Sequence, residues 1–173
     1  MRVGLVSDTH GLFEEGLARL FAGCDLILHA GDIVKPKVLT LLAQIAPVRA
    51  VRGNNDLGPS FELLPELAVI ELDEVPALLV HQVGERGHLL PSIRRALLHH
   101  RPKLVVHGHS HRPHVALEDG VLFVNPGSAG PRRFKLPRSA GLLQVSGRTA
   151  EVRLFDLEDP HLTLIEGPIA SSS

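Results

Sequence analysis

The stretch "RVGLVSDTH", residues 2–10, passes from a short apolar run directly into four polar residues. An apolar run of this length that stops abruptly at polar residues is typical of a buried β-strand. Residues two positions apart in extended backbone project to the same side, and ligands bind at the carboxyl ends of strands in open α/β sheets. The stretch therefore predicts a strand that carries Asp8 and His10 to a binding edge.

The same transition occurs at five further places in the chain. Each time, a short apolar run stops at side chains that close turns or bind metals: "DLIL" before His29–Asp32, "VRAV" before Arg52–Asp56, "ALLV" before His81, "KLVV" before His107–His111 and "VLFV" before Asn125–Ser128. One such cluster would be weak evidence for a site. If the strands are neighbours, however, all of these clusters meet at one edge of the fold.

Segments with helical spacing of apolar residues lie between several of these strands. Apolar residues recur every three or four positions in residues 13–22, 36–46 and 91–100. Proline stands at the first-turn position of the last two segments, where its missing N–H costs nothing. Strands that alternate with helices predict an α/β domain with parallel strand pairing in its first half.

The second half of the chain is predicted to be mainly antiparallel. Turn-forming residues at 73–74, 119–120 and 146–147 separate three pairs of apolar runs, which predicts three hairpins. We find no internal repeat and no linker that would divide the chain. We therefore expect a single domain over residues 1–168, followed by a loose C-terminal tail over residues 169–173.

Composition limits the class of protein. The chain has 173 residues, of which 44% are hydrophobic and 21% charged, which suits one compact domain. Its apolar runs are too short to span a bilayer and its N-terminus does not read as a secretory signal, so we expect a cytoplasmic protein with no membrane partner. The lone Cys24 excludes an internal disulfide. A net charge of −1 offers no broad basic surface, so we expect no stable nucleic-acid complex.

The strand ends supply candidate metal ligands, all of them oxygen or imidazole donors: Asp8, His10, Asp32, Asn54, His81, His109 and His111. Such donors suit Mn, Fe, Zn, Ni or Mg better than a structural zinc ion. Seven ligands are too many for one catalytic ion with an open position, but they fit two ions about 3.5–4 Å apart that share a carboxylate. The positive charge left on such a centre favours an anionic substrate, and phosphate is the obvious candidate.

At this point the pattern resembles the calcineurin-like metallophosphoesterases. Their signature consists of five blocks in order: Asp-x-His, Gly-Asp, Gly-Asn-x-(Asp/Glu), a lone His and Gly-His-x-His. The corresponding blocks here are "DTH" at 8–10, "GD" at 31–32, "GNND" at 53–56, His81 and "GHSH" at 108–111. The small size of the chain and its "NPGS" block are most similar to the short phosphodiesterases of the YfcE/MJ0936 type. The retromer subunit Vps29 shares that fold.

The resemblance implies a four-layer α/β/β/α sandwich of two mixed β-sheets and a dinuclear centre. One divalent ion would take Asp8, His10 and His111, the other would take Asn54, His81 and His109, and Asp32 would bridge them. Mn is the expected metal, with Fe, Ni, Zn or Mg as alternatives. The implied activity is that of a phosphodiesterase in which a metal-bridging hydroxide attacks phosphorus.

The sequence departs from the larger family members directly after Asn54. Those proteins carry a histidine there, which is thought to protonate the leaving group, whereas this chain has Asn55. A carboxamide cannot give up a proton at neutral pH. Help for the leaving group must therefore come from water, from Asp56, from an unplaced histidine, or not at all. With Asp32, these two residues complete the catalytic candidates.

Several residues also allow a structural interpretation instead of a functional one. Asn54 can occupy a left-handed turn, which asparagine tolerates, and His81 can be a packing residue at a strand end, although a second ion needs both as donors. His29 and His107 are expected to support or pack under the ligands. Arg132 and Arg133 can grip a phosphate oxygen, or belong to a solvated basic loop or a subunit contact.

Three functions remain open at this stage. The first is hydrolysis of a small phosphodiester or nucleotide-like substrate. The second keeps the metal centre but acts as a phosphomonoesterase or a nucleotide pyrophosphatase. The third is a non-enzymatic scaffold like Vps29. A homo-oligomer is compatible with each of the three. A scaffold need not keep every ligand, and this chain keeps the whole matched set, which favours an enzyme.

Overall fold

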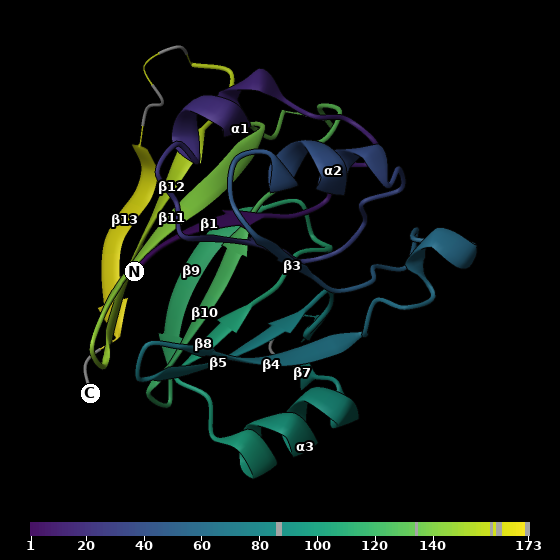
Figure 1. Cartoon of the computed structure of the whole chain (residues 1–173). Helices are drawn as coiled ribbons and strands as arrows, with labels where there is room; N and C mark the ends of the chain where they lie inside the picture. The colour runs from purple at the N-terminus through teal and green to yellow at the C-terminus, as the bar shows by residue number, and fades with distance from the viewer. Residues whose placement is uncertain (86–87, 134, 160, 162–163, 172–173) are drawn as a thin grey trace.

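The computed structural model describes residues 1–85, 88–133, 135–159, 161 and 164–171. Two sheets form its centre (Figure 1). The six-stranded sheet has the order β13 (Leu164–Ser171), β12 (Thr149–Asp156), β11 (Ser139–Ser146), β1 (Arg2–Val6), β2 (Leu26–His29) and β3 (Val48–Ala50). The five-stranded sheet has the order β4 (Leu67–Leu72), β5 (Val75–Val80), β8 (Leu104–Val106), β10 (Val121–Pro126) and β9 (Pro113–Glu118).

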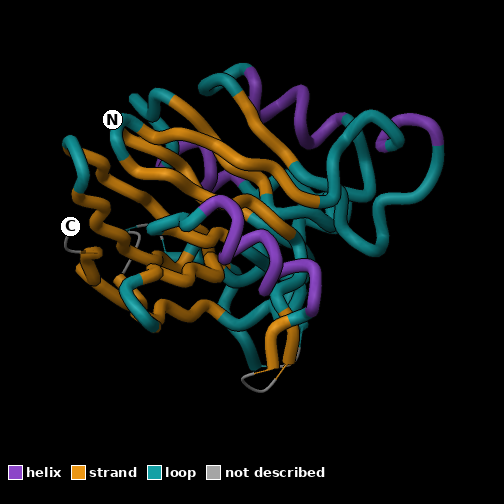
Figure 2. Tube along the Cα trace, turned by 90° about the horizontal axis from the view of Figure 1, so that it is seen from below, coloured by secondary structure: helices purple, strands orange, loops and turns teal. Residues whose placement is uncertain are grey.

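Helices cover the outer faces of both sheets. Helices α1 (Glu15–Leu20) and α2 (Lys37–Ala43) lie over the six-stranded sheet, and α3 (Pro91–His100) lies against the five-stranded sheet (Figure 1). Figure 2, seen from below, shows α3 in front of the strands that it covers. The predicted four-layer α/β/β/α sandwich of two mixed sheets is therefore confirmed.

Parallel and antiparallel pairs occur in both sheets. β1 pairs in parallel with β2, and β2 with β3, whereas β11 and β12 continue the sheet antiparallel. β8 is parallel to both of its neighbours, β5 and β10, while the hairpins β4–β5 and β9–β10 are antiparallel. All three predicted hairpins are therefore present. Backbone hydrogen bonds join the loop after β1 to the loop after β2, and the loop after β8 to the loop after β5.

Alternate residues of the central strands pack into different layers. Leu79 points into the core between the two sheets, while its neighbour Leu78 packs with Ile93 of α3. Leu5 likewise belongs to the core between the sheets, and Val6 packs under α1 and α2. Strands that are buried on both faces need continuous apolar runs, which explains the run pattern of the sequence.

The C-terminal segment differs from its prediction. The tail was expected to be loose from Ile169, but Ile169, Ala170 and Ser171 continue β13 and pair with Val152, Glu151 and Ala150 of β12. The apolar alternation in this segment is interrupted by glycine and proline, so it did not read as a strand. Residues 172 and 173 lie outside the described residues.

The other elements lie close to their predicted positions. Helix α3 spans the predicted residues 91–100, whereas α1 and α2 are shorter than their predicted ranges. A 3₁₀ turn, Pro59–Phe61, and a short hairpin of β6 (Gly84–Glu85) and β7 (His88–Leu89) complete the described elements. None of the described helices is long and apolar enough to cross a membrane.

Candidate metal centre

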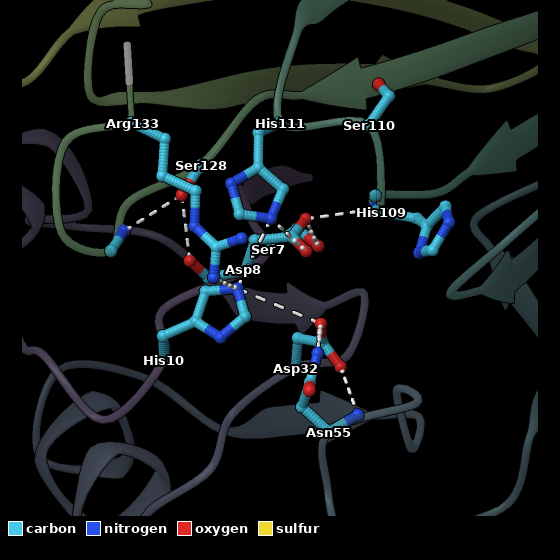
Figure 3. Close-up of polar contacts among 12 residues, drawn as sticks. Ser7, Asp8, His10, Asp32, Asn55, His109, Ser110, His111, Ser128 and Arg133 are labelled. Atoms are coloured by element: carbon cyan, nitrogen blue, oxygen red, sulfur yellow. Dashed lines mark hydrogen bonds and ion pairs between the residues drawn. The ribbon is translucent and has the colours of Figure 1, made fainter.

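The predicted ligands come from loops that meet at one edge of the sandwich. Asp8 and His10 follow β1, Asp32 follows β2, and His109 and His111 follow β8 (Figure 3). All five have positive φ angles, between 45° and 69°. Left-handed backbone is uncommon for residues other than glycine, and it costs free energy that the surrounding structure must supply. The loops thus hold these side chains in place at a conformational cost, as is frequent at functional sites.

The first ligand cluster consists of Asp8, His10 and His111. One potential ligand atom from each lies within 4.8 Å of the others. His111 Nε2 is 3.3 Å from Asp8 Oδ1 and 3.2 Å from His10 Nε2. Asp8 Oδ1 is buried and has no hydrogen-bond partner in the described part of the chain. A buried carboxylate oxygen without a donor, facing two imidazole nitrogens, fits a divalent cation.

The second oxygen of Asp8 is held by the protein itself. Asp8 Oδ2 accepts hydrogen bonds from Ser7 Oγ at 2.7 Å and from the His109 backbone N–H at 3.0 Å. Burial raises the pKa of Asp8, but the contacts with His111, His81 and Ser7 outweigh it and the pKa lies below its ordinary value. The carboxylate therefore stays ionised and fixed in orientation, as a metal ligand must be.

The second cluster is centred on the side-chain oxygen of Asn54. This oxygen lies 3.0 Å from His81 Nε2 and 3.1 Å from His109 Nδ1. His81 Nδ1 lies 2.7 Å from the carbonyl oxygen of Ala30, to which it donates, so Nε2 keeps its lone pair for a ligand. This tautomer is the one that a metal-binding histidine needs, and Nε2 faces Asn54 and Asp32.

Asp32 lies between the two clusters. Its Oδ2 is 3.8 Å from His10 Nε2 of the first cluster and 3.5 Å from His81 Nε2 of the second. Only 3% of the Asp32 side chain is exposed. A carboxylate oxygen that faces imidazoles from both clusters is placed to be shared between two cations.

Asn55 contacts Asp32 through two hydrogen bonds. Its backbone N–H donates to Asp32 Oδ1 at 2.8 Å, and its side-chain Nδ2 donates to Oδ2 at 2.6 Å (Figure 3). These bonds orient the carboxylate. The sequence identifies Asn55 only as the residue that stands in place of a proton donor. The structure adds a positioning contact that the sequence does not reveal.

Asp56 does not occupy the role that was expected of it. Its side chain is buried, with Oδ1 accepting from the Val34 N–H at 2.7 Å and Oδ2 accepting from the Gly53 N–H at 2.8 Å. A carboxylate committed to two backbone donors holds the loop after β3 against the loop after β2. The expectation that Asp56 assists the leaving group is therefore corrected.

The two histidines expected to support the site differ in their environment. His29 is fully buried, and burial lowers its pKa to about 4. The Gly31 N–H donates to His29 Nδ1, so Nε2 carries the hydrogen and donates to Thr9 Oγ1 at 3.1 Å. His29 therefore connects the loop after β1, through Thr9, with the loop after β2, through Gly31. Burial also lowers the pKa of His107 to about 4, and this residue lines a cavity beside His109.

Arg132 and Arg133 lie in different environments. Arg133 Nη2 lies 3.4 Å from His10 Nε2 and points into the site in Figure 3. Arg132 instead pairs with Glu158. The sequence could not distinguish the two, because only the fold determines which guanidinium finds a carboxylate.

Two residues that reasoning from the sequence did not weigh also shape the site. Ser7 Oγ binds Asp8, and Ser128 Oγ donates to the Asp8 carbonyl oxygen at 2.9 Å. Asn125 ties β10 to the loop after β8 by donating to the Gly108 carbonyl at 2.8 Å and to Ser110 Oγ at 2.9 Å. Ser7 lies directly before a candidate ligand, which is the one signal that could have identified it.

Sequence comparison adds independent support. Residues 1–148 match the calcineurin-like phosphoesterase superfamily domain. A probable metallophosphoesterase of Methanothermobacter thermautotrophicus is 31% identical over 161 residues, covering 90% of this chain and 92% of that protein. Phosphodiesterase MJ0936 of Methanocaldococcus jannaschii is 25% identical over 144 residues, covering 73% of this chain and 83% of its own length.

Solved structures share the same fold. The phosphoesterase Yfce of E. coli has a TM-score of 0.68 at 23% identity, covering 96% of this chain and 97% of that one. Vps29 of Entamoeba histolytica, solved in complex with Zn²⁺, has a TM-score of 0.79 at 23% identity, covering 95% and 97%. The ligand clusters, the family match over most of the chain and the shared fold lead to one conclusion: this chain belongs to the calcineurin-like phosphoesterase superfamily, whose members use divalent metals.

Proposed function

We propose that the protein is a dinuclear metal-dependent phosphodiesterase that acts on small phosphodiester or nucleotide-like substrates. The observation that carries this proposal is the position of Asp32 Oδ2, which faces His10 of one ligand cluster and His81 of the other. Two divalent ions, when bound, would supply Lewis-acid activation of a water molecule and of the phosphoryl group. Mn is the proposed metal, with Fe, Ni, Zn or Mg able to bind the same donors.

The residues of the site have distinct proposed roles. Asp8, His10 and His111 would hold one ion, Asn54, His81 and His109 would hold the other, and Asp32 would bridge them. Because Asn54 contributes an uncharged oxygen, the two carboxylates leave a net positive centre for an anionic phosphoryl group. Arg133 adds a guanidinium beside His10, where it can bind a non-bridging phosphate oxygen.

Neither Asn55 nor Asp56 is placed to protonate the leaving group, which favours substrates with good leaving groups. Asn55 donates to Asp32 and has no acidic proton to offer, and the carboxylate of Asp56 is occupied by backbone N–H groups. Without help from these two residues, the departing oxygen must leave as a stable anion or take its proton from water or from a histidine. We therefore propose aryl or nucleotide esters as better substrates than alkyl esters. The name of the related phosphodiesterase MJ0936 agrees with the diester assignment.

A substrate panel tests this function. After metal removal and reconstitution with Mn, we expect bis(p-nitrophenyl) phosphate to be hydrolysed with a kcat/KM at least about tenfold above that of p-nitrophenyl phosphate. Release of mononucleotides from dinucleoside polyphosphates, measured by chromatography, completes the panel, and each of the other four metals is tested in turn. Preference for the monoester or for the pyrophosphate would replace the diester assignment. Absence of hydrolysis with all five metals would favour the scaffold.

Arg133 provides a second prediction. Arg133→Ala is expected to raise KM for bis(p-nitrophenyl) phosphate about fivefold to tenfold, because a charge-assisted contact with the phosphate oxygen is lost. The matched control is Arg132→Ala, whose guanidinium pairs with Glu158 and should leave KM within about twofold of the wild type. Steady-state kinetics on both variants measure the difference. Equal KM changes in the two would assign Arg133 to the solvated loop.

A further inference from the structure

We infer that a cavity beside His109 binds the nucleoside arm of a nucleotide phosphodiester, an inference that rests on the proposed phosphodiesterase function. The cavity has a volume of about 540 Å³. This size lies within the range of small-molecule sites, roughly 300–1,000 Å³. It combines apolar surface with hydrogen-bonding groups. The lining residues are Gln82, Val83, Gly84, His107, Gly108, His109, Ser110 and Arg112.

The position of the cavity relative to the metal centre supports this assignment. His109 belongs to both, since its Nδ1 faces Asn54 in the second ligand cluster and its side chain lines the cavity. Figure 3 shows His109 on the opposite side of the site from Arg133 and His10. A phosphate held between the ligand clusters and Arg133 can therefore extend one of its substituents past His109 into the cavity.

The polar groups of the cavity are available to a ligand. Within the described residues, neither the Gln82 carboxamide nor the Arg112 guanidinium has a hydrogen-bond or ion-pair partner. A carboxamide offers donors and an acceptor together, which matches the mixed edge of a nucleobase. A guanidinium can stack on a planar heterocycle or donate to its carbonyl groups. A simple alkyl or phenyl substituent offers no hydrogen-bonding group to either side chain.

The other cavities fit a nucleoside less well. A cavity of about 310 Å³ is lined by Asn54 and His81 and shares Gln82 with the first cavity, but its arginine, Arg52, already pairs with Glu66 at 2.7 Å. Cavities of about 330 and 460 Å³ are lined by strand residues of the sheets and include none of the candidate metal ligands. Of these four cavities, the one beside His109 therefore meets three conditions. It borders the candidate metal centre, it is large enough for a nucleoside, and its arginine, Arg112, has no carboxylate partner among the described residues.

Two esters with the same leaving group test the inference. We compare kcat/KM for thymidine 5′-(p-nitrophenyl) phosphate with that for methyl p-nitrophenyl phosphate, so that only the second arm differs. The wild-type ratio is expected to be at least about tenfold in favour of the nucleoside ester. Gln82→Ala and Arg112→Ala should each lower this ratio about threefold to tenfold, mainly through KM. The control Ser92→Ala, in the cavity lined by Asn54 and His81, should keep the wild-type ratio.

The outcomes separate the inference from the function on which it rests. A wild-type ratio near one, or an unchanged ratio in both cavity variants, overturns the nucleoside site while the phosphodiesterase stands. If neither ester is hydrolysed with any metal, the phosphodiesterase proposal fails instead. Calorimetry with thymidine and adenosine 5′-monophosphates then decides the inference. Binding that weakens in Gln82→Ala and Arg112→Ala supports the site, and wild-type binding of neither nucleotide overturns it.

Discussion

Replacing Asp32 with alanine is expected to lower kcat/KM for bis(p-nitrophenyl) phosphate by at least about a thousandfold, which corresponds to roughly 4 kcal/mol of transition-state stabilisation. The reason is positional. Asp32 Oδ2 lies 3.8 Å from His10 Nε2 and 3.5 Å from His81 Nε2, so the substitution removes an oxygen from both proposed metal sites at once. Elemental analysis of the variant should find a metal content well below the two ions per chain expected for the wild type.

A matched control keeps this result specific. Glu118 carries an exposed carboxylate at the far end of β9, and Glu118→Ala should retain wild-type activity and metal content. Thermal unfolding of the metal-free variants separates loss of the site from loss of the fold, because Asp32→Ala removes no part of the hydrophobic cores. Retention of activity within tenfold, together with a full metal content, would contradict the bridging role of Asp32.

Substituting Gly108 with alanine is expected to disturb both stability and activity. A Cβ atom at this position would collide with Ser7 Oγ and with Asp8 Oδ2, which are side-chain atoms of the first ligand loop. Crowding of this kind in a packed interior typically costs about 1–3 kcal/mol of the free energy of unfolding. Because relief of the collision requires Asp8 to move, kcat/KM should also fall at least about a hundredfold. Urea unfolding and steady-state kinetics measure the two effects.

Gly120→Ala distinguishes crowding from backbone strain. Gly120 lies in the β9–β10 turn with φ of 75°, and a Cβ atom there would meet nothing within 4 Å. Alanine at this position should cost about 1 kcal/mol through its left-handed backbone, with activity unchanged. If Gly108→Ala instead lost stability like Gly120→Ala and kept its activity, the packing of Asp8 against the loop after β8 would not be needed for function.

Much of the fold was predictable because its signals are local. A strand that is buried on both faces needs a continuous apolar run, as in "DLIL" or "KLVV", and such runs end where the chain enters a turn. The candidate ligands were also proposed from the sequence, since oxygen and imidazole donors that directly follow predicted strands are recognisable without the tertiary structure. β13 was missed because a segment interrupted by Gly167 and Pro168 becomes a strand only when β12 is present to pair with it.

The roles of residues next to the ligands depended on partners that are distant in the sequence. Asp56 was a plausible proton donor until the fold brought the Val34 N–H to it, and Asn55 became a positioning residue because Asp32 lies opposite it. Arg132 and Arg133 are adjacent in the chain, yet one finds Glu158 and the other His10. The sequence by itself determined which side chains could bind metals and which runs would form strands, because residue chemistry and strand burial are local properties. Only the tertiary structure decided which polar groups remain free to act, because a hydrogen bond depends on the partner that folding places within reach.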